Sequence, residues 1–147
     1  MEQKAQILTL GVRDLDASRA FYIEGLGWKA ALDVPGEVIF IQINHGLLLS
    51  LWSIDDMVKE AGDVGFGDKA PTVAFGHLVE SAGAVSETID AAVKAGAELI
   101  TPATERDWGG VSGHFADPDG YRWEVAWNPG FVVDEDGTVT IGEVQTE

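Results

Sequence analysis

A tight turn between two apolar segments near the C-terminal end constrains this chain most. Residues 117–120, Asp-Pro-Asp-Gly, favour a type I turn, because proline fixes φ, aspartate accepts backbone hydrogen bonds and glycine takes the left-handed position. In the strand that returns from it, Arg122 and Glu124 share one face while Tyr121 and Trp123 share the other. A carboxylate in the middle of such a strand lies either on a solvated face or in a cavity, and the pattern leaves both open.

Length, composition and charge limit the class of protein. A chain of 147 residues with 46% hydrophobic and 23% charged residues is typical of one globular domain. It has no cysteine, no apolar run of about 20 residues and no signal-peptide pattern, so we predict a cytoplasmic protein without a membrane span. The net charge of −16 argues against nucleic acid as a partner, because phosphates would be repelled.

The first half of the sequence predicts a strand, a helix and three further strands. Residues 7–12 alternate as a strand, and Asp16 is the expected N-cap of the helix that follows. Glycines 25 and 27 are expected to end that helix. The next strands are predicted at 28–32, 38–43 and 47–52, the last two joined by a hairpin.

The second half repeats this order after a segment rich in glycine and aspartate. It predicts a strand at 71–79, a helix at 86–93, a strand from residue 98, a loop at 102–110, and strands at 111–116 and 121–127. We therefore predict an α+β fold of two paired βαβββ modules in a single domain, with a C-terminal β-hairpin. The boundaries are about 5–60 for module one, 61–70 for the linker, about 71–128 for module two and 129–147 for the hairpin.

Several short motifs resemble the vicinal oxygen chelate superfamily. They are Gly-Val-Arg-Asp-Leu after the first strand, Leu-Gly-Trp after the first helix and Asp-Pro-Asp-Gly-Tyr-Arg-Trp-Glu near the end. The superfamily includes glyoxalase I, bleomycin-resistance proteins, fosfomycin-resistance enzymes and extradiol dioxygenases. The resemblance covers Ile7 to Asn128. It implies that the sheets curl into a half-barrel around a pocket, and that the protein forms a homodimer or paired modules.

The resemblance also implies where metal ligands would stand. The metal enzymes of the superfamily carry ligands at four positions, which fall here on Ile7, Ser50, Ala74 and Glu124. Glu124 is an intact match, Ser50 is a weak donor, and a divalent cation needs three or four N or O donors. We therefore predict no metal and no other cofactor. Two alternatives stay open. Thr72 could stand at the third position, and a one-residue shift in the register of the first strand would place Gln6 at the first position.

Without a metal, the chemistry of the pocket depends on polar and aromatic side chains. His114 and Glu124 are the candidate catalytic residues, since an imidazole and a carboxylate can transfer protons near neutral pH. Equally, His114 could be hydrogen-bonded at a sheet edge, and Glu124 could pair with Arg122. Trp123 is expected in the core. The predicted ligand pocket comprises Thr9, Ser50, Trp52, Trp108, Ser112, His114, Arg122 and Glu124.

Three hypotheses for the function follow. The first is a metal-free protein that binds a small-molecule ligand, as bleomycin-resistance proteins do in a groove between two subunits. The alternative is a metal-dependent lyase, isomerase or dioxygenase of the glyoxalase type with an atypical site. A third is an assembly module whose C-terminal hairpin contacts a partner. Whether the chain is an enzyme stays open on the sequence alone.

Overall fold

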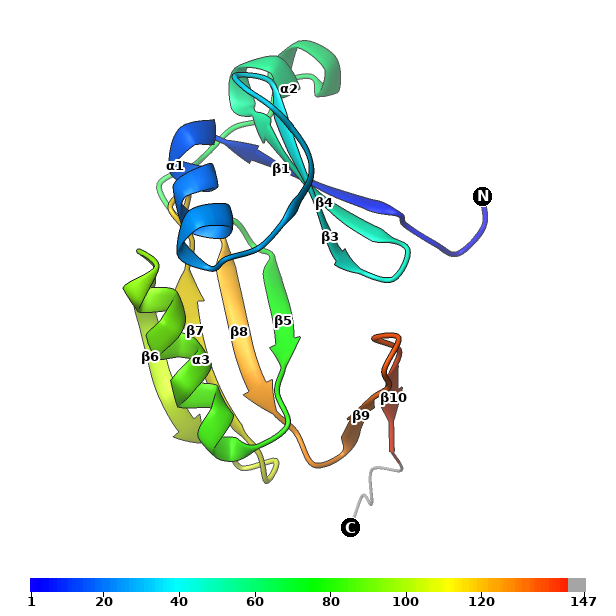
Figure 1. Cartoon of the computed structure of the whole chain (residues 1–147), viewed down its shortest axis with the longest axis vertical. Helices are drawn as coiled ribbons and strands as arrows, with labels where there is room; N and C mark the ends of the chain where they lie inside the picture. The colour runs from blue at the N-terminus through cyan, green and yellow to red at the C-terminus, as the bar shows by residue number, and fades with distance from the viewer. Residues whose placement is uncertain (143–147) are drawn as a thin grey trace.

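A computed structural model describes residues 1–142, so the last five residues of the predicted segment 129–147 lie outside the described part. The chain folds into two four-stranded sheets, a strand pair and short helices (Figure 1). The elements of module one are β1 (Ile7–Val12), α1 (Leu15–Arg19), the π-helical η1 (Ala20–Gly25), β2 (Ala30–Val34), β3 (Val38–Asn44), β4 (Leu47–Ser53) and α2 (Ile54–Ala61). Those that follow are β5 (Ala74–Leu78), α3 (Ala82–Lys94), β6 (Glu98–Glu105), β7 (Val111–Ala116), β8 (Arg122–Trp127), β9 (Phe131–Val133) and β10 (Val139–Ile141).

The two sheets have the same topology, which confirms the predicted duplication and the α+β class. Sheet A has the strand order β1-β4-β3-β2 and sheet B has the order β5-β8-β7-β6. In each sheet the first strand runs parallel to the last strand of its module, and the other pairs are antiparallel. Over residues 1–142 the sheets stay separate and no closed barrel forms.

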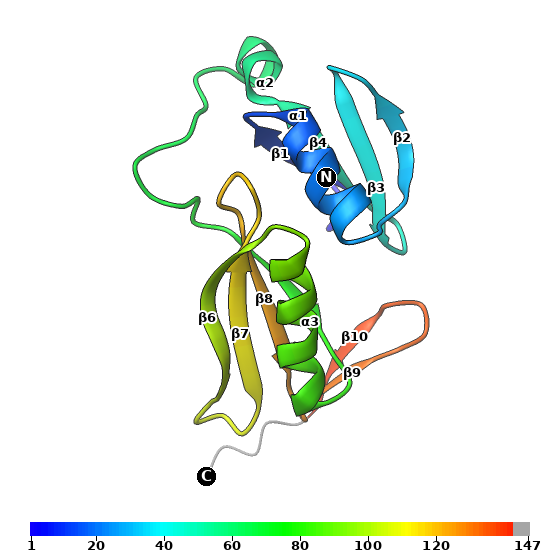
Figure 2. The same cartoon turned by 60° about the vertical axis from the view of Figure 1, so that its left-hand side comes forward.

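Both helices that cover the sheets lie on the same side of the molecule. In Figure 2, α1 lies in front of sheet A and α3 lies in front of sheet B. Each sheet therefore has one face covered by its helix and one face turned away from it, which we call the open face. On sheet A, Ile54 and Met57 of α2 lie over one end of the open face, at Gly11.

The start of the first helix differs from the sequence prediction. Asp14, not Asp16, is the N-cap, and its Oδ1 accepts hydrogen bonds from the backbone N–H groups of Asp16 (2.8 Å) and Ala17 (3.2 Å). Asp16 instead pairs with Arg19 on the helix surface. Two aspartates so close in sequence are equally good caps, so composition alone did not decide between them. Gly27, with φ of 73°, lies just beyond the helix in the left-handed region that glycine favours.

The predicted loop at 102–110 is wrong in its first half. β6 continues to Glu105, with two irregularities in its pairing with β7, and leaves a short turn closed by the Arg106 N–H donating to the Gly110 carbonyl. Pro102 is tolerated because β6 is an edge strand and its register is already shifted there.

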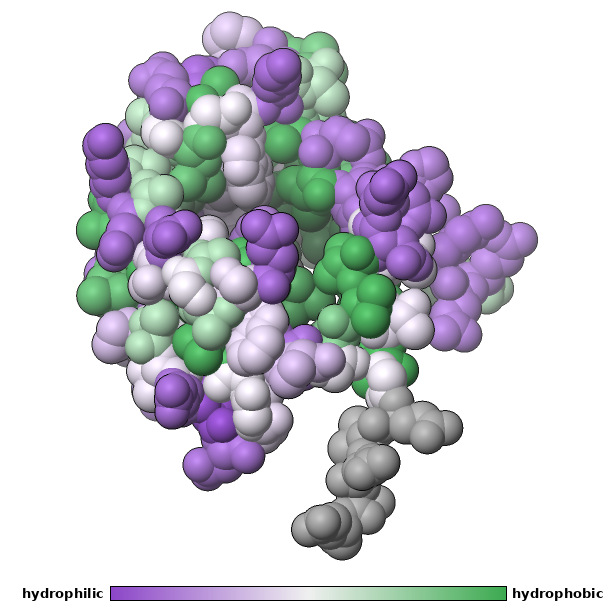
Figure 3. Space-filling view, turned by 60° about the horizontal axis from the view of Figure 1, so that its bottom comes forward, coloured by the Kyte–Doolittle hydropathy of each residue, from purple (hydrophilic) through white to green (hydrophobic). Residues whose placement is uncertain are grey.

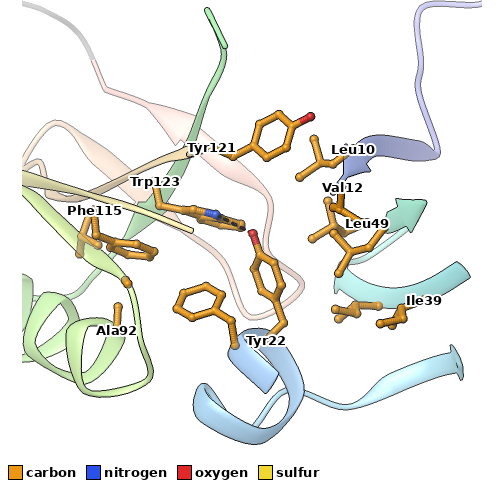
Figure 4. Packing of buried hydrophobic residues seen from close by; sticks show 14 of the residues in the cluster. Leu10, Val12, Tyr22, Ile39, Leu49, Ala92, Phe115, Tyr121 and Trp123 are labelled. Atoms are coloured by element: carbon orange, nitrogen blue, oxygen red, sulfur yellow. Dashed lines mark hydrogen bonds between the residues drawn. The ribbon is translucent and has the colours of Figure 1, made fainter. Parts of the chain in front are cut away.

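The helix-covered faces of both sheets merge into one hydrophobic core. Phe21 and Tyr22 of η1 lie between leucines and isoleucines of sheet A and the aromatic rings of sheet B (Figure 4). Trp123 is 6% exposed, which confirms its predicted place in the core. This packing explains why the two modules form one structural unit.

Polar groups at this junction form what we call the inter-module link. Asp117 accepts hydrogen bonds from the Tyr22 hydroxyl (2.7 Å) and from the N–H groups of Asp119 and Tyr121, and Tyr22 in turn accepts one from the Trp123 indole (3.1 Å). Burial raises the pKa of Asp117 above its usual range.

A second part of the link joins the end of β1 to the turn before β8. The Arg13 N–H donates to Asp119 (2.9 Å), and the Tyr121 hydroxyl donates to the Gly11 carbonyl (2.9 Å). The Asp-Pro-Asp-Gly turn therefore fastens module two onto module one.

The predicted C-terminal hairpin is present as the antiparallel pair β9–β10. It stands beside the sheets, and its turn reaches module one, where the Asn44 side chain donates to the Gly137 carbonyl (3.3 Å). No helix within residues 1–142 has the length and hydropathy that a membrane span requires.

Candidate functional site

Strand register places most predicted site residues on the two open faces. Thr9 pairs with Ser50 in sheet A, and Trp52 lies two residues further along the same face. In sheet B, His114 pairs with Glu124, and Ser112 and Arg122 lie on that face too. Within one chain the eight predicted residues therefore divide between two sheets and one turn.

The open face of sheet B carries a polar row across all four strands. The strand pairings align Gly76, Glu124, His114 and Thr101 in that order. His114 Nε2 lies 3.9 Å from Glu124 Oε1, and the two side chains are 30% and 40% exposed. Nothing lies within 4 Å of the place where a side chain at Gly76 would begin, so Glu124 is open on that side. A ligand could meet an acid and an imidazole here together.

Two arginines frame this row, and sequence reasoning missed one of them. Arg106 donates from Nε to the Ser112 hydroxyl (2.9 Å) and from its terminal nitrogen to the Ser112 carbonyl (3.2 Å). The sequence predicts a loop at Arg106, whereas β6 extends to Glu105 and so brings the Arg106 side chain back over β7. Arg122 donates to the Gly120 carbonyl (3.0 Å), so its hydrogen bond goes to the turn and not to Glu124.

Trp108 lies at the turn between β6 and β7 and is 50% exposed. Its ring lies directly against Gly110, where a Cβ atom would overlap it. The absence of a side chain at Gly110 therefore lets the ring fold back onto the turn. This places Trp108 at the rim of sheet B, on the same turn as Arg106.

The open face of sheet A has a different chemistry. The pairings place no charged residue on it between β1 and β2. Ile7 and Leu32 are 49% and 51% exposed, whereas Ser50 is 3% exposed. The side chains of this face are Ile7, Thr9, Val34, Val38, Phe40, Gln42, Leu48, Ser50 and Trp52, with Leu32 on the edge strand.

The four positions implied for metal ligands occupy equivalent places in the two sheets. Ile7 pairs with Leu48, two residues before Ser50, and Ala74 pairs with Arg122, two residues before Glu124. The side chains there provide one carboxylate and one hydroxyl, and a structural or catalytic cation requires more donors. Nor does any group of three or more His, Asp or Glu residues that could hold a metal occur in the described part of the chain. The residues at these positions do not fit a divalent cation.

Comparisons with known proteins agree with this architecture. A glyoxalase-related enzyme from Fulvimarina pelagi is 37% identical, with a TM-score of 0.87 over 97% of this chain and 100% of that one. A glyoxalase/bleomycin resistance protein/dioxygenase from Nocardioides is 22% identical, with a TM-score of 0.72 over 90% of this chain and 91% of that one. Lactoylglutathione lyase from Agrobacterium tumefaciens is 20% identical, with a TM-score of 0.65 over 86% of this chain and 95% of that one. These last two likenesses concern the fold alone.

A search of curated proteins found no match. The family model that describes the Glyoxalase/Bleomycin resistance protein/Dioxygenase superfamily matches residues 5–125, most of the length of both modules. With the duplicated βαβββ topology and the 37% identical neighbour, this match is decisive. The chain belongs to the Glyoxalase/Bleomycin resistance protein/Dioxygenase superfamily.

Proposed function

We propose that this protein binds a small molecule on the open faces of its sheets and does so without a resident metal. The observation that carries the proposal is the donor set at the four equivalent positions, where Ile7 and Ala74 provide no donor and Ser50 only a hydroxyl. Glu124 then remains available to a ligand, next to His114.

The open faces suit a ligand that is partly flat and partly polar. Sheet B offers the Glu124–His114 pair between two arginines, and sheet A offers Trp52 and Phe40 on an uncharged face. Stacking and cation–π contacts on such rings contribute about 0.5–2 kcal/mol each. The whole predicted ligand pocket is part of the proposed site, including Thr9, Ser50, Trp108 and Ser112.

We further propose that two copies assemble so that the open face of sheet A in one covers the open face of sheet B in the other. Ile7 and Leu32 expose apolar surface on the open face of sheet A, and covering this surface would favour assembly. It carries no charge in a chain of net charge −16, so it is where two copies repel each other least. The strands β1 and β5 are unpaired on one edge and could also meet across the dimer. The lack of cysteine suits the cytoplasm, where we place the protein.

Ligand screening and elemental analysis test the binding proposal together. We expect purified protein to contain less than stoichiometric Zn, Ni, Mn or Fe after dialysis, and its melting temperature to rise with members of a library of aromatic, cationic and thiol-conjugate compounds. Glu124→Gln should lower the affinity of such hits. A library without any hit would contradict the proposal.

Sedimentation analysis tests the dimer. Leu32→Lys places a charge on the proposed interface and should shift the protein toward monomer. Val93→Lys is the matched control, because Val93 is 40% exposed but lies on α3. A monomeric unmodified protein, or equal effects of both variants, would refute the assembly.

The enzyme alternative is favoured by one observation, the 37% identity to a protein described as a glyoxalase-related enzyme. Under that alternative a metal resists dialysis in stoichiometric amount, and Glu124→Ala abolishes its retention. The same elemental measurement therefore decides between the two functions.

A further inference from the structure

A groove of about 820 Å³ lies between the two modules, mostly on the helix-covered side of the sheets, with Gln42, Ala74 and Gly76 of the open faces at its border. Its size falls in the usual range of ligand sites, about 300–1,000 Å³. Trp123, which lines it, points to the helix-covered side of β8, opposite to its neighbour Glu124. The groove is lined by Leu8, Trp28, Lys29, Ile41, Ile43 and Phe75, with Gln42, Asn44, Leu47, His77, Trp123 and strand-edge residues of β5.

The hairpin β9–β10 borders this groove. Asn44, one of the lining residues, donates to Gly137 in the hairpin turn. Figure 3 shows hydrophobic side chains gathered around a hollow beside the hairpin. The groove is thus lined by module one and module two, and the hairpin turn lies at its border.

Three aromatic rings give the groove a preformed wall. The Trp28 and Phe75 ring centroids lie 5.6 Å and 4.8 Å from that of Trp123. Trp123 is held in place, since its indole N–H donates to the buried Tyr22 hydroxyl. Phe75 is tilted by 33° to Trp123 and Trp28 stands at 77° to it, so the rings form a corner that a planar ligand can enter face to one ring and edge to another. Little side-chain freedom is lost on binding, because the rings already pack on one another.

The charge of the lining is unlike that of the rest of the protein. The chain has 25 Asp and Glu residues, yet none of those within residues 1–142 lines this groove, and Lys29 is its cationic residue. Among residues 1–142, Lys29 takes part in no ion pair. Neighbouring groups desolvate part of the His77 side chain and lower its pKa, although the residue is exposed at the groove, where its imidazole can exchange hydrogen bonds with a ligand.

We propose that this groove binds a planar aromatic carboxylate, with its ring system against Trp28, Phe75 and Trp123 and its carboxylate toward Lys29. The ring contacts supply most of the affinity, and Lys29 supplies the preference for an anion. The rings and Lys29 lie away from Glu124 and His114, so this is a second binding site, which adjoins the open faces at Gln42 and Gly76.

Calorimetric titration with naphthalene-2-carboxylate and its neutral analogue naphthalene-2-carboxamide tests the proposal. We expect both to bind, the carboxylate about two- to fivefold more tightly, which is the usual contribution of one partly exposed ion pair. Lys29→Met should remove this difference, whereas Lys94→Met, which removes a lysine from the end of α3, should preserve it. Phe75→Leu should weaken both compounds alike, and Glu124→Gln should change neither.

Three results would overturn the site. They are the absence of binding by both compounds at millimolar concentration, equal affinities in the unmodified protein, and a carboxylate preference that survives Lys29→Met. Neither compound would bind if a second copy or another segment of the chain filled the groove. Near-ultraviolet circular dichroism checks that Phe75→Leu folds, and if it does not, the Lys29→Met and Lys94→Met pair decides alone. A loss of binding in Glu124→Gln would place the compounds on the open face instead.

Discussion

Sheets A and B have one topology but opposite chemistry on their open faces. On sheet A the face is uncharged and partly aromatic, with Phe40 and Trp52. On sheet B it carries Arg122, Glu124 and His114. The helix-covered faces, by contrast, are alike, since both are apolar and merge into one core.

The difference teaches where a duplicated module is free to diverge. The register of the first strand on the last is the same in both sheets, so Ser50 and Glu124 hold equivalent places. The core must keep its apolar character because it stabilises both modules, whereas the open faces are limited only by what they bind. We therefore expect substitutions to have very different effects on the two faces.

The comparison of the two sheets presumes that both modules fold together through the inter-module link. The substitution Asp117→Ala would break this link. The change leaves the Tyr22 hydroxyl and two buried N–H groups without their acceptor, so we expect a loss of about 3–4 kcal/mol of unfolding free energy. Urea unfolding measures it. Asp136→Ala, in the exposed hairpin turn, is the control and should cost much less. A loss below about 1 kcal/mol for Asp117→Ala would mean that the link is dispensable.

Exchanging the equivalent residues sharpens the contrast between the faces. Ser50→Glu places a carboxylate at a position that is 3% exposed on an uncharged face, and should cost about 2–3 kcal/mol of stability. Glu124→Ser removes a side chain that is 40% exposed and should cost less than about 1 kcal/mol. Thermal and urea unfolding of both variants provide the measurement. Similar costs would show that the two faces do not differ in the way described.

The pH dependence of stability gives a smaller effect, localised at the link. Because the folded pKa of Asp117 is raised above its unfolded value, its contribution is fully present below the unfolded pKa and is lost as pH rises through the folded pKa. The unfolding free energy of the unmodified protein, relative to Asp117→Asn, should therefore increase as pH falls through the folded pKa toward the unfolded value of 3.8. The slope cannot exceed about 1.4 kcal/mol per pH unit for one group. A difference that shrinks toward acid would contradict the raised pKa.

Much of this fold could be predicted from the sequence, because periodicity and turn chemistry are local signals. The duplicated strand order, the turn at 117–120 and the core position of Trp123 followed from alternation. The choice of Asp14 over Asp16 as N-cap did not, since both have the same side chain and only the exact backbone path separates them.

The candidate site was less accessible to sequence reasoning. The role of Arg106 depends on how far β6 extends past Pro102. Proline usually ends a central strand, but it is tolerated here because β6 is an edge strand with an irregular register. The link between Tyr22 and Asp117 joins residues 95 positions apart, and a local pattern carries no such information. The inter-module groove could not be foreseen either, because it exists only once both modules pack around η1.

Gly137 gives the C-terminal tail a particular vulnerability. It has a φ of 84°, and the Asn44 side chain occupies the volume that a Cβ atom would need. An alanine there would be strained at this φ, and the Asn44 side chain would have to move and give up its hydrogen bond to the Gly137 carbonyl. The hairpin, whose valines are already exposed, would then lose this tie to module one. Gly137 consequently governs whether the β9–β10 hairpin stays fastened to module one.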